Sequence, residues 1–571
     1  MMGIIQDTQG GRPESILENN PFVPPPTSSC PISRLPPELL SLVFEHGVST
    51  NEDPYDEDEA TAQFWNDFGD VQNEHRTEDG LDRDSDSDLD SDSDPESDES
   101  DSSENSDFED WPPFEILVSH VCKHWRTVAL ETLSLWTTID VSYDERPPYE
   151  RVATYLERSK SLPLSIRIDC EPPDDDFYVN DEEGPRPLSV AELWELLELL
   201  VPHVPRWGFV RMDAASYEHM YTFLEAVSAQ SIPPAAQLQR LQLYHHEDME
   251  TDEVTAFPRP DLSNHFTLFG GSAPCLRSVT LWGVHVNWSQ SWLQSASNLT
   301  ELELAYHSED VRPTWGAFSS MLRSAHALKT LSLCSSGPSG PPVGWIIDPG
   351  TVDWTEGINS SILLSNLSEL VLAFLPSYYA VGLLRRLCTP ALKKLVLDFD
   401  NGEYDDLISQ LVGSATLMAP SLNGQPRNLL RSLESLKLAG LPCIPNSVDL
   451  LYDELVNLKT LHLSMSHLPR RFLEVLLFPS CTVLPALETL YISDVDGEEL
   501  RSLVSQRKDV GLPLKTVYTE ESPDIDPDDV AWLRANLDKF EFFEGSDDDE
   551  IDVIDIATEG DDDEDWSDVS E

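Results

Sequence analysis

The hexapeptide Leu458-Lys459-Thr460-Leu461-His462-Leu463 shows the pattern that decides the fold of this chain. The same Leu-x-x-Leu-x-Leu pattern occurs in seven places, which start at Leu238, Leu299, Leu328, Leu367, Leu392, Leu433 and Leu458. Side chains two apart in a strand point to the same face, so the fourth and sixth positions predict one buried side of a strand. The first leucine is expected to close the turn into that strand. Recurrence every few tens of residues is typical of stacked structural units.

Weaker copies of the pattern lie at Trp207/Val210/Met212, Leu276/Val279/Leu281, Leu487/Leu490/Ile492 and Leu514/Val517. Apolar stretches between the strands, such as 378–387, predict helices that return the chain to the next strand. One such unit cannot bury its apolar face alone, so stacking against neighbours must supply the core. We therefore expect an α/β fold in which residues 141–540 form a leucine-rich-repeat solenoid. Ordinary buried strands of another α/β fold are the alternative interpretation.

The solenoid is expected to be irregular and to end in a capping helix. The intervals between patterns vary from 23 to 41 residues, and no asparagine stands nine positions into any copy, where an asparagine ladder is common. Ala531, Trp532, Leu533 and Leu537 predict the capping helix, with Asp529 as its N-cap.

The strand residues between the core leucines are expected to face outward on the concave side of the solenoid. With neighbouring aromatic residues, they give a mixed surface that suits recognition of a protein substrate. The candidate substrate-binding residues are Tyr244, Trp282, Glu303, Val371, Val396, Lys437, His462 and Tyr491.

The chain is strongly acidic, and this limits its partners. Its 571 residues carry 105 Asp+Glu against 36 Lys+Arg, a formal net charge of −69. Such a field repels phosphates and anionic lipid headgroups, so we expect neither a nucleic acid nor a membrane as partner. Residues 51–110 carry 26 acids and 2 bases, and residues 541–571 carry 16 acids and no base. Both tracts are too charged and too poor in apolar residues to fold alone.

These tracts give the expected domain organisation. Residues 1–31 are aperiodic and predicted to be disordered, and 32–140 form a small helical domain with a disordered acidic insertion at about 49–112. The repeats follow, and 541–571 form a disordered acidic tail. Serines among the acids of the insertion indicate either a solvated loop or a substrate for acidophilic kinases.

Several classes of function are not supported by the sequence. The eight cysteines are far apart and none forms a Cys-x-x-Cys pair, which favours free thiols and predicts no metal site. No motif for phosphate binding, zinc hydrolysis or a serine nucleophile is present, so we expect no catalytic residue and no cofactor. The amino-terminal residues do not resemble a signal peptide, and no apolar stretch reaches the length of a membrane span. We expect a protein of the cytoplasm, the nucleus or both.

Two short apolar helical segments flank the acidic insertion. Leu39, Leu42 and Val43 share one helical face after Leu35-Pro36-Pro37, and Gly47 is expected to end that helix. Helical periodicity resumes at Phe114 and runs to Trp136. Neither segment is long enough to be stable alone, so we expect residues 32–48 and 114–136 to pack together.

These two segments resemble the two halves of an F-box. Residues 32–44 (Ile-Ser-Arg-Leu-Pro-Pro-Glu-Leu-Leu-Ser-Leu-Val-Phe) are similar to the first half. Residues 118–129 are similar to the second, with a Val-Cys-basic-x-Trp-Arg core, and Leu135-Trp136-Thr137-Thr138-Ile139 resembles the close seen in many fungal F-box proteins. The acidic insertion is a departure, since an F-box usually runs unbroken.

The resemblance implies a non-catalytic substrate adaptor of a Skp–cullin–F-box ubiquitin ligase. It implies that the F-box segments bind a Skp-type adaptor, and cullin through it, while the repeats bind a protein substrate. The residues implied at the adaptor interface are Leu35, Pro36, Leu39, Leu40, Val43, Phe44, Val121, Cys122 and Trp125. The same residues suit the core of a small helix bundle, and the sequence does not separate the two roles. The alternative function is an acidic leucine-rich-repeat scaffold or chaperone that binds basic proteins.

Overall fold

The computed structural model describes residues 35–49, 112–171, 186–228, 231–245, 256–289, 292–345, 362–399, 402–413, 429–478, 483–520, 522–523 and 525–543. The described chain divides into two compact units. The first contains residues 35–49, 112–139 and 150–164, and the second contains 140–149 and 165–543. The expectations for residues 1–31, for most of the acidic insertion and for the acidic tail lie outside the described residues.

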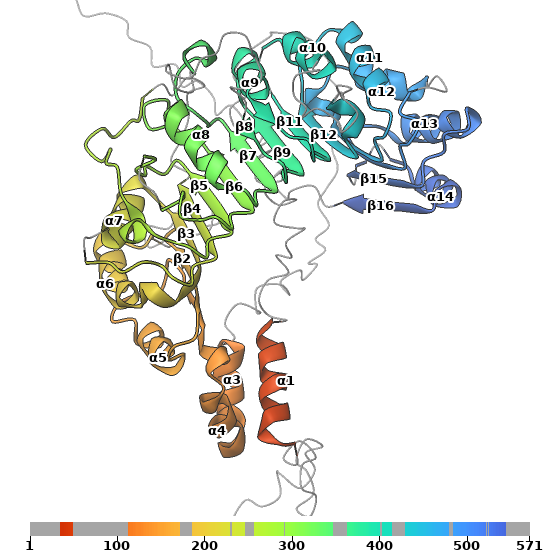
Figure 1. Ribbon diagram of the computed structural model, residues 1–571. Coiled ribbons are helices and arrows are strands. Elements are labelled where there is room, and N and C mark those ends of the chain that lie inside the picture. The colour runs from red at the N-terminus through yellow and green to blue at the C-terminus, as the bar shows by residue number, and fades with distance from the viewer. Residues whose placement is uncertain are drawn as a thin grey trace, which may run out of the picture. The chain divides into compact units, whose positions relative to one another are not determined.

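The first unit is helical. Its elements are α1 (Pro37–Ser49), α3 (Phe114–Val121), α4 (Lys123–Glu131), η2 (Leu133–Trp136) and α5 (Glu150–Arg158). Figure 1 shows α1 beside α3 and α4, although 64 residues separate α1 from α3 in the chain. Cys122 lies between α3 and α4 and caps the start of α4, because its sulfur accepts a hydrogen bond from the Trp125 amide at 3.4 Å.

Gly47 does not end the first helix, contrary to the sequence expectation, since α1 continues to Ser49. A Cβ atom on Gly47 would overlap the ring of Phe114. The residue therefore serves close packing between α1 and α3. A glycine near a helix end is ambiguous in sequence because both roles favour it.

The second unit contains a large parallel sheet. Within the described residues, fourteen strands join in the order β1-β2-β3-β4-β5-β6-β7-β9-β11-β12-β13-β14-β15-β16, and the pairs from β3 to β16 are parallel. The strands are β1 (Thr138–Val141), β2 (Leu164–Asp169), β3 (Trp207–Ala214), β4 (Arg240–His245), β5 (Ser278–Trp282), β6 (Glu301–Ala305), β7 (Thr330–Cys334), β9 (Glu369–Ala373), β11 (Lys394–Asp398), β12 (Ser435–Gly440), β13 (Thr460–Ser464), β14 (Thr489–Ser493), β15 (Thr516–Glu520) and β16 (Lys539–Phe543). The short strands β8 (Ile362–Leu363) and β10 (Leu387–Cys388) pair separately. Spatial order follows chain order, as stacked repeats require.

Helices connect these strands. They are α6 (Val190–Leu200), α7 (Tyr217–Ser228), α8 (Trp315–Ser324), α9 (Ser377–Leu384), α10 (Asp405–Gly413), α11 (Pro445–Glu454), α12 (Arg471–Leu477), α13 (Gly497–Asp509) and α14 (Pro527–Asn536). Short 3-10 turns complete the connections: η4 (Val201–Arg206), η5 (Leu268–Gly271), η6 (Pro342–Gly344), η7 (Leu430–Ser432) and η8 (Met465–His467). In Figure 1 the helices from α8 onward lie along the outer side of the sheet. The expected α/β fold with repeated strand–helix units is confirmed at this level. No helix in the described ranges has the length and apolar character that a membrane span requires.

The leucine pattern sets the register of the sheet. Leu370, Leu395, Leu436 and Leu461 pair across β9, β11, β12 and β13, and each is 0% exposed. The first leucine of each of the seven copies is also buried. The core therefore lies between the leucine face of the sheet and the connecting helices.

The carboxyl ends of four consecutive sheet strands share a turn. The residue after β5, β6, β7 and β9 has a positive φ: Gly283 (64°), Tyr306 (52°), Ser335 (42°) and Phe374 (49°). Each of these residues donates its backbone N–H to the carbonyl that ends the next strand, at 2.8–3.0 Å. This left-handed conformation is unfavourable for residues other than glycine, so the inter-strand hydrogen bonds must hold it.

The carboxyl-terminal boundary differs from the sequence expectation in two respects. The N-cap of α14 is Asp526, whereas Asp529 lies in its first turn and accepts a hydrogen bond from Arg501 at 2.7 Å. Residues 541–543 belong to strand β16, so the fold extends past the expected start of the tail at 541. The strand contains the apolar residues Phe540, Phe542 and Phe543. It was missed because the tail was defined by its count of acidic residues.

Candidate protein-binding surfaces

Helix α1 has one face buried in the first unit. Leu40 and Phe44 are both 0% exposed, and the Phe44 ring lies 5.1 Å from the Trp125 ring of α4. Together with Gly47, they stand at i, i+4 and i+7, so they form one stripe of the helix. The two segments that flank the acidic insertion are thus held together by an aromatic contact and a close backbone approach.

The opposite face of α1 is apolar and exposed. Leu39 is 50% exposed, Leu42 is 58% exposed and Val43 is 51% exposed. Val121, at the end of α3, is 60% exposed. Exposed large apolar side chains are common singly, but three on one helical face form a candidate interaction surface.

The other residues that the F-box resemblance implies are placed differently. Pro36 and Cys122 are exposed, whereas Leu35 and Trp125 are half-buried. The structure therefore divides the nine residues into core (Leu40 and Phe44), partly covered (Leu35 and Trp125) and exposed (Pro36, Leu39, Val43, Val121 and Cys122). Leu42 joins the exposed group and was not among the candidates.

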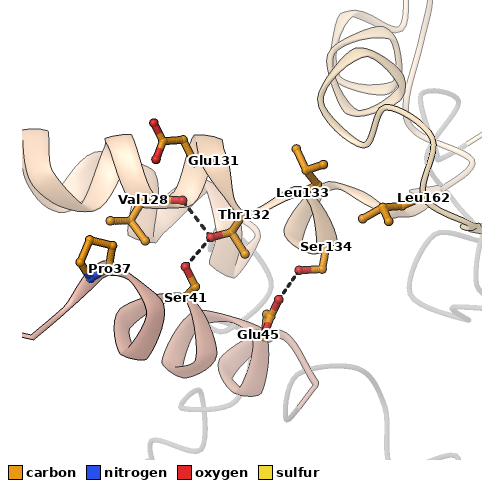
Figure 2. Close-up of a pocket in the computed structure, with 9 residues that line it drawn as sticks. All are labelled: Pro37, Ser41, Glu45, Val128, Glu131, Thr132, Leu133, Ser134 and Leu162. Carbon is orange, nitrogen blue, oxygen red and sulfur yellow. Dashed lines mark hydrogen bonds between the residues drawn. The ribbon is translucent and has the colours of Figure 1, made fainter.

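A pocket of about 390 Å³ lies on the same unit (Figure 2). Its lining residues are Pro37, Ser41, Glu45, Val128, Glu131, Thr132, Leu133, Ser134 and Leu162. The Ser41 and Thr132 hydroxyls are hydrogen-bonded at 2.8 Å, and Ser134 donates to the Glu45 carboxylate at 2.5 Å. These bonds tie α1 to the segment after α4, which gives the pocket a structural role.

The second surface is the face of the sheet opposite the leucines, here called the open face. It is defined by the aligned row Thr280, Glu303, Ser332, Val371, Val396, Lys437, His462, Tyr491 and Tyr518, one residue from each strand from β5 to β15. A second row two residues later includes Tyr244, Trp282, Ala305, Cys334 and Ala373. The sequence-based candidates for substrate contact all belong to these rows.

Three of those candidates are buried, which corrects the expectation that they face solvent. Trp282 is 4% exposed, Val371 is 2% exposed and Val396 is 0% exposed. They pack with Ala305, Cys334 and Ala373 in one apolar cluster, against which Tyr244, Tyr306 and Phe374 also pack. The small side chains of the second row leave room for aromatic residues to cover the valines, so this part of the open face has a core of its own.

The remaining candidates are half-buried, and their titration reflects it. Burial raises the pKa of Glu303 to about 8, opposed by the hydrogen bond that Trp282 Nε1 donates to its Oε1 at 2.7 Å. Burial also lowers the pKa of Lys437 to about 8, although Asp398 partly counters this. The pKa of His462 falls to about 3, first through burial and then through the charges of Lys437 and Lys394.

Aromatic rings stack across the carboxyl-terminal strands of the open face. The His462 and Tyr491 rings are 3.9 Å apart with an angle of 5° between their planes. Tyr491 and Tyr518 follow at 4.3 Å and 12°, and the Lys539 ammonium lies 5.0 Å from the Tyr518 ring. The ladder joins β13 to β16 and gives this end of the face a flat, rigid surface.

Sequence reasoning missed several residues of the open face. Tyr306 and Phe374 belong to turns, and Tyr518 lies on a strand with only a weak copy of the pattern and was not singled out. Tyr306 and Phe374 each follow directly after a strand that carries the leucine pattern, so an aromatic residue at that position is a usable signal. The described residues contain no group of His, Cys, Asp and Glu that could hold a metal ion.

Comparisons with known proteins found a likeness only among solved structures. No family model matches the chain, and no curated protein matches it. Twenty-nine chains of solved structures match it. One is from the crystal structure of the Rad7 and Elc1 complex in yeast, with 15% identity, a TM-score of 0.30, and coverage of 62% of this chain and 88% of that chain.

Proposed function

We propose that the chain is a non-catalytic substrate adaptor of a Skp–cullin–F-box type ubiquitin ligase inside the cell. In this proposal the first unit binds a Skp-type adaptor, and cullin through it. The sheet of the second unit holds a protein substrate. No step of chemistry is assigned to the chain itself.

The exposed apolar face of α1 carries the proposal. Leu39, Leu42 and Val43 are each at least half exposed, while Leu40 and Phe44 already supply the core contact with α4. Stability of the unit therefore does not explain the exposed side chains, and binding of a partner does. The F-box resemblance of residues 32–44 and 118–129 supports a Skp-type adaptor as that partner.

The proposal is tested with a Leu39→Ala, Val43→Ala double variant and purified Skp-type adaptor. Truncating anchors of an apolar interface costs about 2 to 4 kcal/mol, which corresponds to about 30- to 1,000-fold in affinity. Because both residues are exposed, the fold should survive, and circular dichroism and thermal unfolding check this. The dissociation constant is measured by isothermal titration calorimetry.

A matched control uses Leu450→Ala, which truncates an exposed leucine of α11 in the second unit. Its adaptor affinity should equal that of the wild type. Failure of the wild-type chain to bind the adaptor rejects the proposal, and so does unchanged affinity in the double variant.

A second function is favoured by the net charge of −69. An acidic leucine-rich-repeat scaffold or chaperone would bind basic proteins through exposed charges, and salt would weaken that binding. Removing residues 544–571 keeps β16 and deletes most of the acidic tail. The scaffold function would be favoured if the double variant still binds a histone-type basic protein. That binding should also be lost at high salt or after this truncation.

A further inference from the structure

We propose that the open face around Glu303 is a binding site for the cationic side chain of a lysine or arginine on a partner protein. The inference rests on the proposed function in one respect, since that partner is the substrate held by the sheet. It adds the chemical class that the substrate must present.

The Glu303 carboxylate lacks a counter-charge in the described structure. It stands in the middle of β6 and is half-buried, with Trp282 Nε1 as its hydrogen-bond donor at 2.7 Å. Among the described residues, no lysine or arginine forms an ion pair with it, whereas other carboxylates of the sheet are paired, as in Arg211 with Asp213 and Lys394 with Glu369. Burial without a cation favours the protonated form of this group, and a bound cation would stabilise the ionised carboxylate.

A second polar group beside Glu303 also lacks a partner. Ser332 is the residue aligned with Glu303 on β7 and is 4% exposed. Its Oγ has no hydrogen-bond partner among the described atoms. Buried hydroxyl groups are nearly always hydrogen-bonded, so an unpaired one points to a donor that is supplied by a ligand. An ammonium or guanidinium group can donate to both the carboxylate and this hydroxyl.

Aromatic rings border the carboxylate. The Trp282 ring lies 5.1 Å from the Tyr244 ring and 5.5 Å from the Tyr306 ring, with the planes at 78° and 72°. Burial is the main cause that raises the pKa of both phenols, and the charge of Glu303 adds to it. Aromatic faces attract cations, and Arg211 already occupies such a position 5.0 Å from the Tyr244 ring.

Binding at this site should depend on pH. Burial raises the pKa of Glu303 to about 8, so the carboxyl group is mostly protonated at neutral pH and must release its proton when a cation binds. The other titratable or charged groups on this part of the face are Arg211, Asp213, Tyr244, Tyr306, Cys334 and Asp398. Burial raises the pKa values of Tyr244, Tyr306 and Cys334 above their usual values, so these three stay neutral across the range in question.

The test uses small probes because the substrate is unidentified. N-acetyl-lysine amide and N-acetyl-arginine amide are titrated into the full chain labelled with ¹⁵N at tryptophan, and N-acetyl-norleucine amide is the uncharged control. The Trp282 indole signal is assigned by its loss in Trp282→Phe. We expect both cations to shift it saturably and norleucine to leave it unchanged. If only the deprotonated form binds, affinity rises about 50-fold between pH 6 and pH 8.

Glu303→Gln is the decisive variant, because glutamine keeps the size and can still accept from Trp282 while it removes the charge. It should abolish cation binding and its pH dependence. Glu301→Gln is the matched control, since Glu301 lies on the same strand, is exposed, and should bind as the wild type does. Retained binding in Glu303→Gln, or equal shifts with norleucine, overturns the proposal.

The outcome is separable from that of the proposed function. Glu303→Gln should bind the Skp-type adaptor as tightly as the wild type, because the adaptor is assigned to α1. If adaptor binding fails while the lysine probe still requires Glu303, the ligase role is wrong and the cation site stands. If the adaptor binds and the probes do not, the ligase role stands and the cation site is wrong.

Discussion

Val396 behaves as a core residue although its strand position predicts an outward side chain. Leu395 and Val396 are both 0% exposed, on opposite faces of β11. The pattern alone predicts that aspartate is tolerated at 396 and not at 395. The structure predicts that both Leu395→Asp and Val396→Asp bury an unpaired charge and lose several kcal/mol of stability.

Urea denaturation followed by circular dichroism measures these losses. Leu450→Asp on the surface of α11 is the control and should change stability far less. A Val396→Asp variant as stable as this control would show that the open face lacks the core described above.

His307 gives the stability of the chain a dependence on pH. Its Nδ1 lies 2.9 Å from Ser336 Oγ and its Nε2 lies 3.1 Å from the Val284 carbonyl, and the side chain is buried. Burial, followed by the charges of His285 and Arg312, lowers its pKa to about 3. The folded pKa lies below the unfolded value of about 6.5, so protons favour the unfolded chain.

The contribution of His307 is therefore complete above about pH 6.5 and is lost as the pH falls toward 3. His307→Asn keeps a polar side chain that does not titrate. We expect this variant to lose less stability than the wild type between pH 7 and pH 5, measured as the change in urea midpoint. Equal losses in both proteins would mean that His307 has the same pKa in the folded and unfolded chains.

At the scale of elements, α1 depends on a close approach to α3. A Cβ atom at Gly47 would overlap the Phe114 ring, so Gly47→Ala should loosen the first unit in spite of the better helix propensity of alanine. Hydrogen exchange should show lower protection of the α1 amides in this variant. Adding Phe114→Leu makes room for the methyl group and should restore protection, whereas Glu38→Ala on the exposed side should leave it unchanged.

Most strands of the sheet could be predicted from the sequence, but not all. The leucine pattern and its weaker copies predicted strands β3 to β7, β9 and β11 to β15 and the burial of Leu370, Leu395, Leu436 and Leu461, because both follow from local alternation. Strands β1, β2 and β16 lack the full pattern and were missed. In β2, Leu164, Ile166 and Ile168 alternate and are all 1% exposed, so a search for alternation alone would have found it.

The face of α1 that is buried could not be predicted. Apolar residues occupy both faces, with Leu40 and Phe44 on one and Leu39, Leu42 and Val43 on the other, so periodicity fits either choice. The choice depends on Phe44 meeting Trp125 and on Gly47 meeting Phe114, and both partners lie beyond the acidic insertion. Glu303 presents the same difficulty, since its lack of a counter-charge depends on which residues the neighbouring strands place beside it.

At the scale of the whole molecule, the sheet needs its last strand. A chain that ends at Glu520 loses α14 and β16, including the Arg501–Asp529 ion pair and the pairing of β16 with β15. Strand β15 then becomes an edge with unpaired backbone groups, which favours association between chains. We expect this truncation to lower the melting temperature and to form aggregates, as measured by light scattering.

The matched truncation ends at Phe543 and keeps β16. It should remain monodisperse and as stable as the full chain. If both truncated chains aggregate, the effect comes from loss of the acidic tail. If neither aggregates, β16 is not needed to close the sheet.

The separation of α1 from its partners has a consequence during synthesis. Ribosomes add roughly 5–20 residues each second, so the 64 residues between α1 and α3 take about 3–13 seconds to translate. For that time Leu40 and Phe44 are as accessible as Leu39, Leu42 and Val43, because the segment is too short to fold before α3 and α4 are made. The strands of the sheet are exposed for a shorter time, because each strand is made after the neighbouring strand with which it pairs. Among the described elements, α1 therefore waits through a long stretch of synthesis before the partners of its buried face exist.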